Sequence, residues 1–214
     1  GDGSMTEYIA AEIIRDLMGS DLCLDIHASN IYLTEVPQIR INELHEKELV
    51  PLAEQANVDF VWVHGASTVL ESTLAYSLNS RGVPCLVVEM GVGMRITRSI
   101  GEQMTEGIFN LMKTLGIWQG EVGEIRKPVV SADPEEVFFL NASRSGIFVQ
   151  EARHNTYLKK GDSIGKVIDP LEGTVLEDVV SPEDGLLFTI REYPVVDEGS
   201  LMARILRTKE RQED

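Results

Sequence analysis

The sequence is poor in cysteine, and its two cysteines form no metal-binding or disulfide pattern. Cys23 and Cys85 are the only cysteines among 214 residues. Each lies in an apolar run, DLCLDI or PCLVVE, which is typical of a buried free thiol in a protein from a reducing compartment. Because a cysteine-ligated zinc site needs closely spaced Cys or Cys/His pairs, the sequence does not predict one.

Basic residues are also scarce. The chain has 19 Lys and Arg against 35 Asp and Glu, which gives a net charge of −16. A protein that binds polyanions needs a basic face, so we expect neither nucleic acid nor an anionic membrane as a partner. A small anionic substrate still fits this composition, because one local basic pocket is enough to hold it.

Long apolar runs are missing too. No run is long enough to span a bilayer, and no signal peptide is recognisable, so we expect a soluble, cytoplasmic protein. Hydrophobic residues make up 43% of the chain, which is ample for one large core or two smaller ones.

The first 120 residues alternate between helix and strand patterns. Apolar residues at helical spacing predict four helices, and short apolar runs between turn-formers predict three strands. The helices are expected at 6–18, 42–56, 69–79 and 96–115, and the strands at 21–27, 58–64 and 83–90. We therefore predict an α/β fold with a mainly parallel or mixed sheet flanked by helices.

The pattern changes after about residue 120. Short alternating runs such as EVFFLNA, SIGKVID and GLLFTIRE follow one another between Gly, Pro, Asp and Asn, which predicts a small all-β domain. We therefore expect an α/β catalytic-type domain over 1–120, a β domain over 121–208 and a charged tail over 209–214.

Three polar residues fall near the carboxyl ends of the predicted strands. These are His27, His64 and Glu89, and ligands of open parallel sheets gather at that edge. Glu89 is the most informative, because a carboxylate inside the apolar run VPCLVVEM is costly to bury unless it is paired or faces a polar cleft. His64 is a candidate for lining a substrate pocket, with a third metal ligand as the alternative. A structural carboxylate at Glu89 remains the alternative.

Asp25 and His27 form the second candidate feature. Residues two apart on a strand share a face, so Asp25 is positioned to accept one imidazole N–H of His27 and to leave the other nitrogen for a metal. A half-buried structural histidine is the alternative. Arg81, Arg95 and Arg98 flank Glu89 in the sequence and are candidates for binding a substrate carboxylate, unless they are ordinary surface arginines.

The order of these features resembles the succinylglutamate desuccinylase/aspartoacylase family, whose fold is similar to that of zinc carboxypeptidases. The resemblance lies in the D-x-H strand at 25–27, and in the V-V-E-M-G strand about sixty residues later. The region 145–205 is similar to the family's β domain, which is reminiscent of a lipoyl or biotinyl carrier fold. The turn PLEGTVLEDVVSP has no lysine, so we expect no covalent cofactor, and the domain then shapes a pocket wall or a homo-oligomer contact.

The resemblance implies a role for each residue of the site. His27 would be a zinc ligand, Asp25 the carboxylate beside it, and Glu89 the general base. The family's other two ligands come from an upstream H-x-x-E motif, and no such motif precedes His27 here. We therefore expect the sequence to begin just after that segment, and these 214 residues to be inactive by themselves.

The implied function is a metal-dependent hydrolase of carbon–nitrogen bonds, a deacylase that cleaves the amide of an N-acylated amino acid or similar small molecule. Two alternatives remain open. A zinc carboxypeptidase would share the fold and the zinc but cleave C-terminal residues from peptides, whereas a non-catalytic fragment would bind a ligand or partner without zinc.

Overall fold

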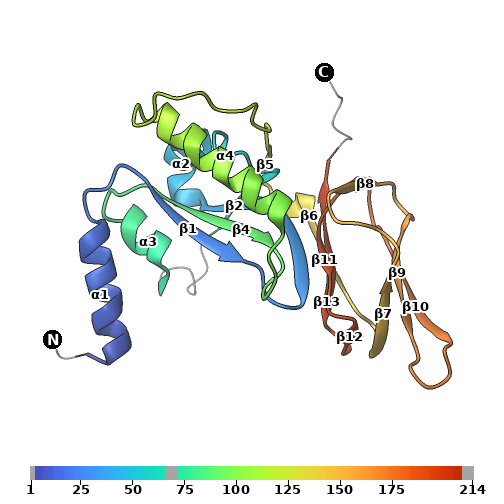
Figure 1. Cartoon of the computed structure of the whole chain (residues 1–214). Helices are drawn as coiled ribbons and strands as arrows, with labels where there is room; N and C mark the ends of the chain where they lie inside the picture. The colour runs from blue at the N-terminus through green and yellow to red at the C-terminus, as the bar shows by residue number, and fades with distance from the viewer. Residues whose placement is uncertain (1–2, 66–71, 209–214) are drawn as a thin grey trace. The chain divides into compact units, whose positions relative to one another are not determined.

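The computed structural model describes residues 3–65 and 72–208, which form two compact units (Figure 1). The first unit comprises Gly1–His27, Gln38–Val88 and Gly101–Ala132. The second comprises Ala28–Pro37, Glu89–Ile100 and Asp133–Asp214. The chain therefore passes between the units five times, and neither unit is one continuous stretch. The predicted boundary near residue 120 stays a prediction, and the predicted tail lies outside the described residues.

The helices belong almost entirely to the first unit. They are α1 (Met5–Leu17), the 3₁₀ helix η1 (Glu43–His45), α2 (Glu46–Ala53), α3 (Leu74–Asn79) and α4 (Arg98–Thr114). A capping box explains where α1 begins, since the Ser4 side chain accepts from the Glu7 backbone N–H and the Glu7 carboxylate accepts from the Ser4 backbone. The helix ends before Gly19, whose φ of 85° suits glycine.

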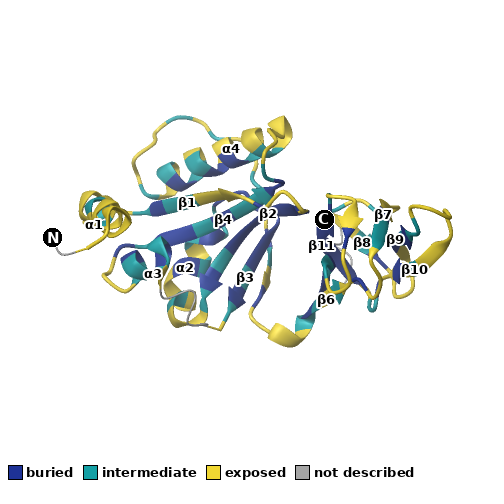
Figure 2. Cartoon of the chain, turned by 90° about the horizontal axis from the view of Figure 1, so that it is seen from below, coloured by how far each residue is buried: buried dark blue, intermediate teal, exposed yellow. Residues whose placement is uncertain are grey.

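The sheet of the first unit follows the strand order β1-β4-β2-β3-β5. Its strands are β1 (Cys23–Ala28), β2 (Leu33–Asn42), β3 (Phe60–His64), β4 (Cys85–Gly91) and β5 (Val129–Ser131). Strand β3 is parallel to both β2 and β5. Figure 2 shows β2, β3 and β4 largely buried, whereas β1 passes from a buried start to an exposed end. The mixed sheet flanked by helices confirms the predicted fold class.

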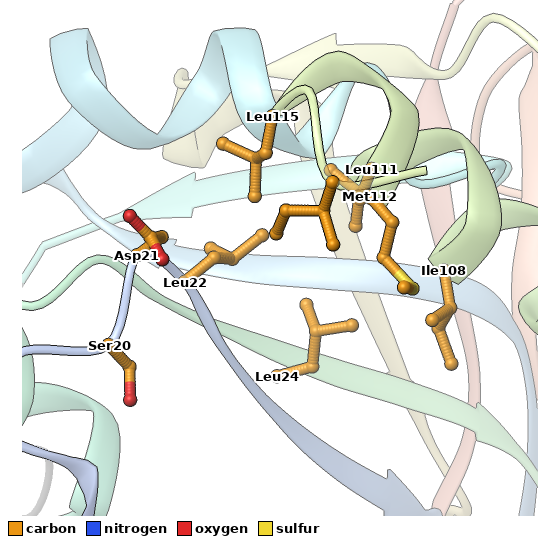
Figure 3. A pocket seen from close by; sticks show the side chains of 9 residues that line it. Ser20, Asp21, Leu22, Leu24, Ile108, Leu111, Met112 and Leu115 are labelled. Carbon is orange, nitrogen blue, oxygen red and sulfur yellow. The ribbon is translucent and has the colours of Figure 1, made fainter. Parts of the chain in front are cut away.

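Helices cover both faces of this sheet. On one face, apolar residues of α1 and α3 pack against Cys23 and Cys85, at the starts of β1 and β4. Helix α4 covers the opposite face (Figure 1). Its residues Leu111 and Met112 line a pocket together with Leu22 and Leu24 (Figure 3). All seven predicted elements of residues 1–120 have a counterpart in the structure, although part of the helix predicted over 69–79 lies outside the described residues.

Strand β2 was not predicted from the sequence. Its sequence, LTEVPQIRIN, mixes charged residues with a proline, and seven of its first eight positions are buried regardless of polarity. Its second half does alternate between polar and apolar residues, with Ile39 and Ile41 between Gln38, Arg40 and Asn42. That period of two was the available signal.

The second unit is built from two sheets. In one, β11 (Gly185–Arg191) pairs with β13 (Leu201–Arg207), with β8 (Thr156–Leu158) and with the start of β2, and β13 pairs with β6 (Val137–Asn141). The other has the order β10-β9-β7-β12. Its strands are β7 (Gly146–Gln150), β9 (Ser163–Ile168), β10 (Val175–Val180) and β12 (Val195–Val196), and a further 3₁₀ helix, η3 (Pro134–Glu136), precedes β6.

An apolar core and a buried ion pair stabilise the second unit. The core includes Phe148, Ile164, Leu187 and Met202, from both sheets. Glu35 of β2 is only 2% exposed, and its carboxylate lies 2.7 Å from Arg204 Nη1. Charges this deeply buried need such a partner, so the pair holds the start of β2 against the β strands of this unit.

Within the described residues, no helix combines the length and apolar character that crossing a membrane requires.

The packing of α4 against the end of α2 gives a direct test of the first unit. A Cβ atom at Gly107 would overlap the carbonyl oxygen of Ala56, so we expect Gly107→Ala to lower the free energy of unfolding by about 1 to 3 kcal/mol. Gly101, in the same helix, has open space around it, and Gly101→Ala should stabilise by up to about 1 kcal/mol. Urea unfolding of both variants measures the difference, and equal effects would contradict the close approach.

Candidate functional site

Asp25 and His27 lie on one face of β1, as their spacing predicts. His27 Nε2 is 3.0 Å from Asp25 Oδ1. The His27 side chain is 48% exposed and that of Asp25 is 22% exposed, so the ring reaches solvent while the carboxylate behind it is partly covered. An imidazole that donates through Nε2 keeps Nδ1 as its lone-pair nitrogen, and Nδ1 of His27 is therefore the atom able to bind a metal.

The two cysteines lie in the buried cluster at the start of β1, whereas the end of the strand is exposed to solvent. Cys23 and Cys85 are both buried free thiols, which confirms the prediction from their apolar runs. Burial raises the pKa of the Cys85 thiol, and the neighbouring Cys23 and Asp25 raise it further. A thiol that stays protonated is a poor metal ligand. The pair therefore anchors the starts of β1 and β4 by packing.

Glu89 is the fifth residue of β4, in the second unit. It is partly buried between the buried Val88 and the partly buried Met90. Alternation along the strand gives it the same face as Cys85 and Val87. The structure therefore places the carboxylate at the carboxyl end of a strand that is the sheet neighbour of β1.

The glycine loop after Glu89 has a structural role. Gly91 has a φ of 59°, which suits glycine. A Cβ atom at Gly93 would lie 2.6 Å from the carbonyl oxygen of Ser29, and the Gly93 N–H donates to Asn30 O at 3.1 Å. Glycine at 93 thus lets the loop after β4 pass directly over the loop after β1.

The three candidate arginines lie in different settings. Arg95 forms an ion pair with Glu192, which also accepts from Thr34 Oγ1 at 3.1 Å. Arg81 precedes β4 and donates to the Ser77 carbonyl at 2.7 Å, at the end of α3. Arg98 is exposed and begins α4. Their predicted role in binding a substrate carboxylate stays a prediction.

Strands β2 and β3 share a polar and aromatic face that was not predicted from the sequence. Gln38, Arg40 and Asn42 lie opposite Phe60, Trp62 and His64 in the parallel register. The Arg40 guanidinium lies 5.8 Å from the Trp62 ring, which meets the His64 ring edge-on at 5.4 Å. His64 thus belongs to a cationic and aromatic face of the first unit, and its place beside a substrate stays a prediction.

Gln38 is the most unusual residue of this face. Its side chain is fully buried, and no described residue hydrogen-bonds to its amide oxygen or nitrogen. Buried amides are normally paired, since an unpaired one costs about 1 to 3 kcal/mol. The alternation Q-I-R-I-N was the signal that could have revealed this face.

The donor set for zinc is incomplete in the described residues. They contain no group of three or more His, Cys, Asp or Glu side chains arranged to hold a metal ion. Catalytic zinc normally takes three protein ligands and a water. His27, with Asp25 behind it, fits one of these three positions.

The fold defines a structural class: an α/β unit with a mixed sheet and a second unit rich in β-strands, which solved structures share. The chain is similar to the ectoine utilization protein EutE (DoeB) of Ruegeria pomeroyi, with 21% identity and a TM-score of 0.79. It is also similar to a succinylglutamate desuccinylase of Silicibacter sp. TM1040 (20%, 0.80) and to an aspartoacylase family protein of Mesorhizobium loti (18%, 0.72). The fold that the sequence resemblance implied is therefore confirmed.

The similarity covers nearly the whole chain but only part of each structure. It spans 97%, 96% and 97% of this chain, respectively, and 64% of each of the three structures. No protein-family model matches the sequence, and no curated protein matches it.

The hydrogen bond between Asp25 and His27 can be tested directly. In the neutral imidazole of His27, we expect the proton on Nε2, because the Asp25 carboxylate accepts it there. Asp25→Ala should shift this ring toward a mixture of tautomers. Long-range ¹H–¹⁵N correlation spectra at alkaline pH report the tautomer, with His45 of η1 as the internal control. An unchanged His27 spectrum would contradict the assigned bond.

Proposed function

We propose that this chain is part of a zinc-dependent deacylase that hydrolyses the amide bond of an N-acylated amino acid or a similar small molecule. The main observation behind this proposal is the contact of the His27 imidazole with the Asp25 carboxylate at the exposed end of β1. The fold supports the proposal, because solved structures named as a succinylglutamate desuccinylase and an aspartoacylase family protein share it. The net charge of −16 argues for a small substrate held locally.

His27 is the proposed metal ligand of this chain, through Nδ1. A zinc ion there would lower the pKa of a bound water and polarise the scissile carbonyl. Two further ligands are needed, and we propose that they come from polypeptide outside these 214 residues. Asp25 contributes by fixing the tautomer and the orientation of the ring, as carboxylates behind ligating histidines generally do.

Glu89 is the proposed general base. Its carboxylate takes a proton from the attacking water, whose oxygen bonds to the acyl carbon. The same proton then passes to the departing nitrogen as the carbon–nitrogen bond breaks, so that a free amine and a carboxylate are released. The glycine-rich loop that follows is held by Gly93 against the loop after β1, which restrains the backbone beyond Glu89.

Binding of the substrate carboxylate is proposed for the basic side chains near the strand ends: Arg81, Arg95, Arg98 and His64. Arg95 would have to exchange Glu192 for the substrate, because the two are paired in the absence of a ligand. We add Arg40 to this group because its side chain lies on the same face of the sheet as Trp62 and His64. Guanidinium binds carboxylate in a bidentate fashion, which suits this role.

We further propose that the protein is located in the cytoplasm and that its β strands form a homo-oligomer contact.

Glu89→Gln tests the mechanism. In the protein as its host produces it, the substitution should lower turnover of an N-acyl amino acid by roughly a hundredfold or more, because the amide cannot accept the proton. Bound zinc, measured by elemental analysis, should stay unchanged. Glu177→Gln, in β10, is the matched control and should retain full activity. Substantial activity in the Glu89 variant would refute the assignment.

A further inference from the structure

Three segments of the second unit are tied to one another by backbone hydrogen bonds. They are the loop after β1, the loop after β4 and the segment after β11. The Gly93 N–H donates to Asn30 O at 3.1 Å. The Tyr32 carbonyl accepts from the N–H groups of Glu192 and Tyr193, at 2.8 and 3.2 Å. The backbone of Glu192 is therefore held against the loop after β1.

Arg191, the residue before Glu192, stabilises the same segment. Its side chain belongs to a residue that is only 8% exposed, where an unpaired charge would be costly. The guanidinium donates to the backbone carbonyls of Tyr193, Val195 and Leu201, at 3.0, 2.7 and 3.3 Å. These bonds fix the chain that follows Glu192, so the position of Glu192 is set by its surroundings on both sides along the chain.

Glu192 has two side-chain partners, one on each carboxylate oxygen. Its Oε1 forms the ion pair with Arg95, and Thr34 Oγ1 donates to its Oε2 at 3.1 Å. The side chain of Glu192 is 27% exposed, whereas that of Arg95 is 63% exposed. The Thr34 hydrogen bond and the backbone therefore keep the carboxylate in place even when Arg95 turns away from it.

Arg95 lies in a loop whose neighbouring side chains extend into solvent. Met94 is 92% exposed and has a φ of 63°, a left-handed conformation that costs a non-glycine residue free energy. Ile96 is 99% exposed. Because neither neighbour is packed against the protein, the ion pair with Glu192 is what orients the Arg95 guanidinium.

We propose that Glu192 determines the ligand specificity of Arg95 by competing with the ligand carboxylate. The Glu192 carboxylate occupies the guanidinium until the carboxylate of an N-acyl amino acid replaces it, while Thr34 keeps Glu192 in place. An uncharged amide lacks the charge that displaces Glu192, so the site selects anions. This role rests on one part of the proposed function, the binding of the substrate carboxylate by Arg95.

The charge of Glu192 also indicates which carboxylates fit. Ion pairs as exposed as this one are weak, so Glu192 raises the Kd of a ligand carboxylate by only about two- to sixfold. Once displaced, the Glu192 carboxylate is a negative charge beside the bound ligand, and it repels a second acidic group. The expected ligand therefore has one carboxylate, as in the N-acyl derivative of a neutral amino acid.

Binding of N-acetylglycine tests this role. Glu192→Gln keeps an oxygen that accepts from Thr34 but loses the charge that pairs with Arg95. In the protein as its host produces it, NMR titration should give a Kd for N-acetylglycine about two- to sixfold lower in this variant than in its parent. The Kd for N-acetylglycinamide, which has the same size and no carboxylate, should not change. Every sample also carries Glu89→Gln, so that the ligand is not consumed.

Two comparisons show whether the effect depends on the charge of Glu192 and on Arg95. Glu198→Gln, at an exposed residue of the same segment, is the matched control and should leave both Kd values unchanged. In an Arg95→Gln background, Glu192→Gln should no longer alter the Kd of N-acetylglycine, because the guanidinium for which the carboxylates compete is gone. N-acetylglutamate should bind more weakly than N-acetylglutamine to the parent, and Glu192→Gln should narrow that difference.

Several results would overturn the role of Glu192. They are an unchanged Kd for N-acetylglycine in Glu192→Gln, an equal gain for N-acetylglycinamide, and a gain that persists without Arg95. No measurable binding by any variant would overturn it too, because Arg95 would then bind no ligand carboxylate. Turnover is measured separately in protein that retains Glu89. If turnover is absent while the binding results hold, the deacylase function fails and the role of Glu192 stands.

Discussion

The pairing of β1 with β4 is the interaction on which the candidate site depends. Burial decreases along β1, from Cys23 packed against Cys85 and α3 to His27 in solvent. The apolar start of β1 is packed into the core and sets the position of the strand. The backbone hydrogen bonds between β1 and β4 then determine which face of the sheet each side chain occupies. Asp25 and His27 meet because both obey that alternation. A slip of one residue would carry both side chains together to the opposite face of the sheet.

In β2 and β3, the same alternation places apolar side chains on one face of the sheet and polar and aromatic side chains on the other. Ile39, Ile41, Val61 and Val63 are buried on one face, and the other face carries amide, guanidinium, indole and imidazole groups. The buried Gln38 amide has no hydrogen-bond partner among the residues that the structure describes, and burying it in this way costs stability, so the face is not optimised for packing alone. Polar groups kept at such a cost are more typical of a functional site than of a core.

The acidic side chains and the exposed apolar residues of α1 affect association in opposite ways. A net charge of −16 makes molecules of this chain repel one another. Met5, Ile9 and Ile13 of α1 are 74%, 51% and 45% exposed, and apolar surface of this kind lowers its free energy when it is covered.

Local patterns in the sequence determined most helices, three strands of the first unit, the burial of the cysteines and the positions of Asp25, His27 and Glu89 at strand ends. These follow from periodicity and turn residues, which act over a few positions. Tertiary structure alone decided the rest: which strands pair with β2, the contact of Arg40 with Trp62, the burial of Gln38 without a hydrogen-bond partner among the described residues, and the partner of Arg95. These depend on which distant strands lie side by side, since backbone pairing between residues far apart in sequence leaves no periodic trace.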